Sequence, residues 1–73
     1  MLYPNPAREM LSIEAKSIRQ VRIYDLFGQT CIAHSNLLTD KLIVNITSLN
    51  PALYFVEICT DYGKCVRKVE VVR

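Results

Sequence analysis

The feature that most constrains the fold is an alternation of apolar and polar residues, which returns along almost the whole chain. Apolar side chains at every second position are typical of β-strands with one buried face, whereas a helix would repeat every three to four positions. Residues 2–6 could add a short seventh strand to the six segments with this pattern. The segments are residues 9–15, 20–26, 29–35, 41–47, 53–60 and 65–73. Within them, the side chains expected to share a face are Leu11 with Ile13, Val21 with Ile23, Leu42 with Val44 and Ile46, and Tyr54 with Val56 and Ile58.

The stretches between these segments contain the residues that tight turns require. Gly28, which ends the stretch Asp25–Gly28, can adopt a positive φ. For the last hairpin we expect a type I turn with Gly63 in the left-handed conformation, which would pair Thr60 with Lys64. Short strands separated by turns every 8–12 residues predict an all-β fold, an antiparallel sandwich or barrel. A helix over residues 7–21 is the alternative.

The chain has 73 residues, which is enough for one domain, and we expect residues 1–73 to be a single module of a longer protein. Two of its three prolines lie in Tyr3-Pro4-Asn5-Pro6. Proline fixes φ, lacks an amide proton and keeps the preceding residue out of the helical region. We therefore expect residues 1–8 to be a stiff lead-in, and the sequence leaves open whether it is a linker exit, a sheet edge or a docking segment.

Composition and motifs argue against several classes of function. The net charge of +2 is too small to indicate binding to nucleic acid or to an anionic membrane. The single histidine, His34, has no nucleophile elbow or phosphate loop to accompany it, so we predict no catalytic residue and no enzyme. Cys31, Cys59, Cys65 and His34 are zinc-ligand types, but residues 31 and 34 would point to opposite faces of one strand. We therefore expect neither a metal nor a cofactor.

The cysteines leave one alternative open. With the type I turn described above, Cys59 lies opposite Cys65 in a non-hydrogen-bonded pair. The Cα atoms of such a pair are about 4.5 Å apart, at the short end of the disulfide range. A two-residue turn would remove this pairing and leave free thiols. The count of three is odd, which does not suit a simple disulfide scaffold.

Taken in order and spacing, several motifs resemble the C-terminal sorting domain of the type IX secretion system. They are the proline pair, the turn "IYDLFG", the strand "LYFVE" and the basic end "KVEVVR". The candidate sorting-motif residues that this resemblance singles out are Tyr3, Pro4, Asn5, Pro6, Asp25, Gly28, Tyr54, Lys68 and Arg73.

The resemblance implies an immunoglobulin-like antiparallel β-sandwich of about seven strands. Such a module follows a cargo protein of Bacteroidota, passes through the periplasm and is recognised by an outer-membrane translocon. A sortase-type peptidase usually removes it, and the cargo is released or attached to the cell surface. The resemblance implies no cofactor, no small-molecule substrate and no nucleic acid.

Two further expectations concern recognition. We hypothesise that the last strand is read by strand addition, with Lys68 and Arg73 making charge contacts to an acidic receptor surface. The competing function is an immunoglobulin-like spacer, or an adhesion or carbohydrate-binding module, of a larger secreted protein.

Overall fold

The protein is all-β, as predicted. The structure, a computed structural model, describes residues 1–73 and contains no helix, so the helical alternative over residues 7–21 is wrong. None of its elements is a helix long and apolar enough to span a membrane. Its six strands are β1 (Leu2–Tyr3), β2 (Met10–Tyr24), β3 (Thr30–His34), β4 (Thr39–Asn45), β5 (Ala52–Thr60) and β6 (Gly63–Val71).

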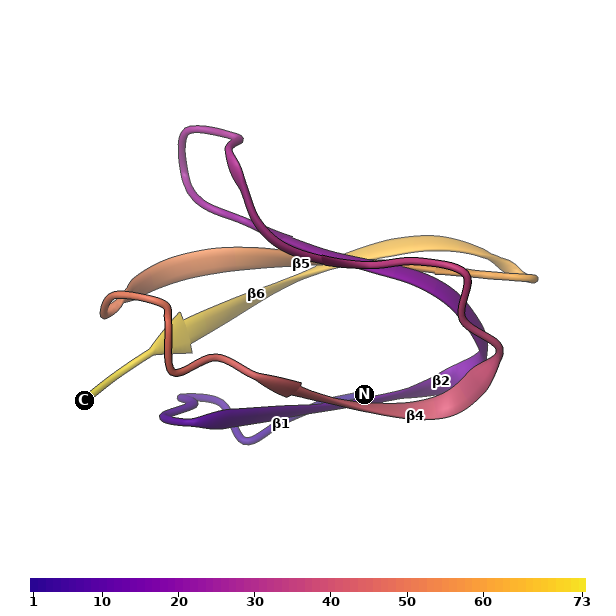
Figure 1. The fold of residues 1–73 in the computed structure, drawn as a ribbon, viewed down its shortest axis with the longest axis horizontal. Helices are drawn as coiled ribbons and strands as arrows, with labels where there is room; N and C mark the ends of the chain where they lie inside the picture. Colours follow the sequence, from indigo (N-terminus) through magenta and orange to yellow (C-terminus); the bar gives the residue numbers. More distant parts are fainter.

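One long strand, β2, organises the sheet. Its first half pairs with β1 and β4, and its second half pairs with β3 and β5. Between the halves the register shifts, and Ser17 adopts a φ of 58°. Such a bulge bends a strand and increases its twist. Figure 1 shows the result: β2 leaves one layer, curves, and continues in the other.

The expected immunoglobulin-like sandwich of seven strands is not confirmed, because the structure is one antiparallel sheet of six strands curled into a half-barrel. Residues 9–15 and 20–26, predicted as separate strands, both belong to β2. The residues between them, 16–19, form the bulge, and Ile18 among them is fully buried. The Asp40 carboxylate holds the bulge by accepting the N–H of Ser17 at 2.9 Å.

The core lies between the two layers and is entirely apolar. The side chains predicted to share a buried face are buried, apart from Leu42, which is half-buried. A fully buried aliphatic side chain contributes roughly 1.5–3 kcal/mol. The predicted core residues that the structure buries are Leu11, Ile13, Val21, Ile23, Val44, Ile46, Tyr54, Val56 and Ile58.

The β5–β6 hairpin differs from the expected register by one residue. Its turn has two residues, so Thr60 pairs with Gly63 instead of Lys64. Cys65 then lies opposite Ile58, and Cys59 lies opposite Lys64. Because neighbouring positions of a strand point to opposite faces, the two thiols are on different sides of the sheet. Of the two alternatives left open for the cysteines, the Cys59–Cys65 disulfide is therefore excluded by the two-residue turn, and all three cysteines are free.

The N-terminal residues are part of the fold, and of the alternatives left open for residues 1–8 the structure shows pairing at sheet edges. Leu2 and Tyr3 pair with β2, and Ala7 is fully buried beside Val71 of β6, in a parallel bridge. The segment therefore starts on one layer and ends on the other. It closes part of the gap between the two edges of the half-barrel.

Candidate functional site

Residues 5–7, which we call the N-terminal clasp, bond to the outer edge of β6. The side chain of Asn5 acts as a short substitute for a strand, since its oxygen accepts the N–H of Glu70 at 3.2 Å. Its amide nitrogen donates to the carbonyl of Lys68 at 3.4 Å. Ala7 continues the ladder by donating to the carbonyl of Glu70 at 2.8 Å and accepting the N–H of Val72 at 2.9 Å.

The other end of the Tyr-Pro-Asn-Pro stretch is fixed to the opposite layer. Tyr3 lies opposite Ser12 of β2, and its hydroxyl donates to the carboxylate of Glu14. Pro4 and Pro6 are exposed, and the peptide bonds that precede them are cis. All four residues of the motif thus belong to the connection between the layers. Because proline has no main-chain N–H, Pro4 and Pro6 leave no donor that would need an acceptor.

Asp25 and Gly28 build the turn between β2 and β3, a hairpin that projects away from the two layers (Figure 1). One carboxylate oxygen of Asp25 accepts the main-chain N–H groups of Phe27 and Gln29, at 2.9 and 3.0 Å. Gly28 has a φ of 82°, as the sequence predicts. The side chain of Phe27 at the tip is 94% exposed, so the turn holds an apolar group in solvent.

Tyr54 anchors the loop that enters β5. Its ring is buried, and its hydroxyl donates to the carbonyl of Asn50 at 2.7 Å. This contact resembles the tyrosine corner of β-sandwich proteins, in which a tyrosine bonds to backbone a few residues upstream. Burial raises the pKa of Tyr54, and the negative charge of Asp25 adds to the shift.

The structure brings no group of metal-ligating side chains together. Nowhere do three His, Cys, Asp or Glu side chains come close enough to hold a metal ion. Cys31 and His34 lie on β3 and are exposed, and the register places His34 opposite Val21.

A comparison with protein families gives a direct result. A family model described as the secretion system C-terminal sorting domain matches residues 1–72. The chain belongs to this family. The sorting domain is a tail of the type IX secretion system, which implies a cargo protein exported to the cell surface or secreted. Comparison with curated proteins and with solved structures returned no significant match.

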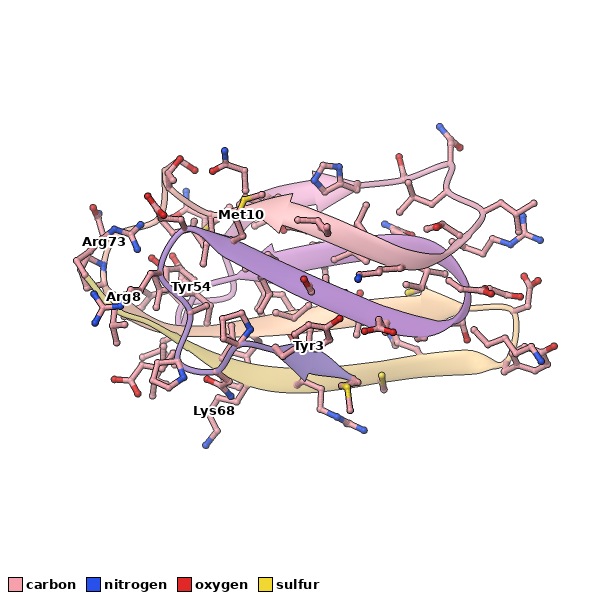
Figure 2. The ribbon with its side chains drawn as sticks, turned by 90° about the horizontal axis from the view of Figure 1, so that it is seen from below. Tyr3, Arg8, Met10, Tyr54, Lys68 and Arg73 are labelled. Atoms are coloured by element: carbon pink, nitrogen blue, oxygen red, sulfur yellow. The ribbon has the colours of Figure 1, made fainter.

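Arg73 closes the end of the sorting domain that carries the clasp. Its guanidinium donates to the carbonyl of Arg8 and to three carbonyls of the loop after β4. These belong to Leu49 at 2.6 Å, Ile46 at 3.0 Å and Thr47 at 3.3 Å. In Figure 2, Arg73 and Arg8 lie at the same end of the molecule. The side chain thus ties the end of β6 to two other segments.

Lys68 differs from Arg73, although both carry the basic signature of the last strand. It is exposed on β6 and takes part in none of the three ion pairs of the sorting domain. Figure 2 shows its side chain extending outward from the ribbon. Of the two cations singled out from the sequence, Lys68 is therefore the one with a free charge.

Two contributors to this end were missed by sequence reasoning. Ala7 is wholly buried, and the main-chain carbonyl of Arg8 accepts a bond from Arg73. The local sequence carries no signal for either role, since a single alanine after proline has no periodicity and a carbonyl is common to all residues. Both roles arise because the two ends of the chain meet.

Proposed function

We propose that the sorting domain directs a cargo, attached before its first residue, across the outer membrane through the type IX translocon. The cargo would pass through the periplasm and reach the cell surface or the medium. A sortase-type peptidase would usually remove the domain during this step. The observation that carries the proposal is the family match over residues 1–72.

The role of the motif residues in the fold supports this proposal. Tyr3, Asn5, Asp25 and Tyr54 each make side-chain hydrogen bonds that fix a turn or a connection. They would serve as the frame of a signal that the machinery recognises by shape. In this view the chain is itself the substrate of the export machinery, and it carries out no chemistry.

The two cations for which we expect charge contacts, Lys68 and Arg73, have different roles in this proposal. Lys68 is free to meet an acidic receptor surface. The guanidinium of Arg73 is already engaged by main-chain carbonyls, and we propose that it contributes by holding the recognised end in shape.

The test is a fusion of residues 1–73 to a fluorescent reporter that has its own inner-membrane export signal. The fusion is expressed in a bacterium with a type IX system and in an otherwise identical strain that lacks the translocon. We expect reporter in the medium or on the surface of the first strain, and reporter held in the periplasm of the second. The matched control is the same reporter without residues 1–73.

Two results would refute the proposal. Reporter that stays in the periplasm of both strains would favour the spacer or adhesion function. Reporter that leaves both strains equally would show that export does not depend on the translocon.

A further inference from the structure

Part of the outer edge of β6 has no partner strand. On this edge, even-numbered residues point their main-chain groups outward, as the clasp bonds of Lys68, Glu70 and Val72 demonstrate. Along a β-strand, the main-chain N–H and C=O groups of successive residues point alternately to the two sides of the strand. The main-chain groups of Lys64 and Val66 therefore also point outward, away from β5. No other segment of the chain pairs with them, and only the carbonyl of Val66 has a donor, the neighbouring side chain of Arg67 at 3.1 Å. We call residues 64–68 the open edge.

The open edge lies beside a hollow at the mouth of the half-barrel. This hollow has a volume of about 360 Å³ and is bounded by the bend of β2 on one side and the start of β6 on the other. Its lining includes Lys16 and Lys64, and no acidic residue. The clasp covers the edge of β6 from the carbonyl of Lys68 onward. The part of β6 before this carbonyl, which forms the open edge, is not covered by it.

Positive charge dominates this region. Lys64, Arg67 and Lys68 all lie on the open edge, and Lys16 lies across the hollow. The carboxylate of β5 that shares a face of the sheet with Lys64 and Lys68 is Glu57, which is already shared between Arg22 at 3.4 Å and Lys64 at 3.9 Å. The carboxylate of the hairpin, Asp61, is engaged by Arg19 at 2.8 Å. Of these cations, Lys16, Arg67 and Lys68 therefore have no ion-pair partner.

From this geometry we infer that the open edge accepts an extended, acidic segment of a partner protein, which adds a strand to β6. The inference rests on the proposed function, since the partner would belong to the export machinery. Lysine on an edge strand normally discourages pairing between copies of one protein. The same cations would repel a second copy here and attract a strand with alternate Glu or Asp side chains.

The site has the dimensions of ordinary strand addition. Five residues of β-strand span roughly 17 Å, which is a typical strand length. An added strand would bond to the free N–H groups of Val66 and Lys68, in the manner that Asn5 and Ala7 already bond to the next part of the edge. Main-chain bonds would supply affinity, and the alternate acidic side chains would supply specificity.

A solution experiment tests the inference without secretion. The probe is a synthetic seven-residue peptide that alternates glutamate with valine, and its control has lysine at each glutamate. Binding to isotope-labelled residues 1–73 is followed by amide chemical shifts and by hydrogen exchange. We expect the glutamate peptide to perturb and protect the amides of Lys64, Val66 and Lys68. Because both peptides offer the same main-chain groups, ion pairs in place of like-charge repulsion should make it bind about tenfold more tightly than the control.

Variants make this test specific. Val66→Pro removes an outward N–H without removing a bond to β5, so the domain should fold and bind about tenfold more weakly. Val66→Thr, which keeps the N–H and the branched shape, should bind like the parent. The inference is overturned by equal binding of both peptides, by unchanged binding to Val66→Pro, or by perturbation of Glu70 and Val72, which would mean that the peptide displaces the clasp instead.

The same variants in the reporter fusion separate this inference from the proposed function. We expect export of the parent fusion to depend on the translocon. We expect Val66→Pro to reduce this export several-fold and Val66→Thr to leave it unchanged. Equal translocon-dependent export of all three would overturn the open edge as a recognition site and leave the sorting function intact. Failure of the parent fusion itself would count against the sorting function, while the peptide experiment would still decide the property of the edge.

Discussion

Replacing Arg73 by alanine is the sharpest test of how the sorting domain is held together. The guanidinium bonds to Leu49 and Ile46 are part-buried, whereas those to Thr47 and Arg8 are exposed, so water can replace the latter. Two part-buried bonds from a charged donor, at about 1–1.5 kcal/mol each, give a loss of about 2–3 kcal/mol. A domain of this size has a free energy of unfolding of about 4–11 kcal/mol, so the loss is a large fraction of the total.

The assay is urea denaturation followed by circular dichroism, together with thermal melting. A loss of about 2–3 kcal/mol corresponds to a fall in Tm of roughly 10–20 °C in a domain of 60–100 residues. The matched control is Lys68→Ala, which removes an exposed cation of β6, the strand that precedes Arg73, and should change the free energy of unfolding by less than about 0.5 kcal/mol.

Arg73→Lys separates shape from charge. Lysine keeps the charge but lacks the planar fork that reaches several carbonyls at once, so we expect it to recover less than half of the lost stability. If Arg73→Ala unfolded within about 0.5 kcal/mol of the parent, the reasoning from these hydrogen bonds would be refuted. Full recovery by lysine would show that the charge, and not the fork, is what the position requires.

Three further predictions concern the turns. Asp25→Ala should lower the free energy of unfolding by about 1–2 kcal/mol in urea titrations, because two main-chain N–H groups lose their acceptor, and Asp25→Asn should lose less. Gly28→Ala should lower the free energy of unfolding by about 1 kcal/mol, measured in the same way. A Cβ at this position meets nothing within 4 Å, so the loss comes from the φ of 82° alone. An unchanged urea midpoint would contradict this reasoning. Tyr54→Phe should cost about 1 kcal/mol at pH 7 through the lost bond to Asn50. The pKa of Tyr54 is raised in the folded state. The neutral hydroxyl therefore contributes its full stabilisation below the unfolded-state pKa of about 10, and this contribution is lost as the pH rises through the folded-state pKa. The gap between the urea midpoints of the parent and Tyr54→Phe should therefore narrow above pH 10, and a constant gap from pH 8 to 11 would exclude this linkage.

Much of the fold and some of the site could be predicted from local patterns. Alternation identified the all-β class and the buried faces, including Leu11 and Val56, because the side-chain period of a strand is a local property. The need for a positive φ at Gly28 was also visible, since glycine is the residue that adopts it without cost. The order of the motifs identified the family, which the family model confirms.

The number of strands and the register of the last hairpin were predicted incorrectly, and both errors have the same cause. The register of the hairpin at Gly63 differs from the expected one by a single residue, and the bulge that joins the two halves of β2 is centred on one residue with a positive φ, Ser17. Strand propensity does not resolve such small differences, because pairing depends on neighbours that are distant in the sequence.

By itself, then, the sequence determined the all-β class, most of the side chains that face the core, and the family to which the chain belongs. Only the tertiary structure decided that Asn5 and Ala7 pair with β6, that Arg73 bonds to the loop after β4, and that residues 64–68 are left open. The physical reason is that at least one partner in each of these contacts is a main-chain group, which is the same in every residue. Which of them meet is set by the curl of the whole sheet, and not by any local pattern.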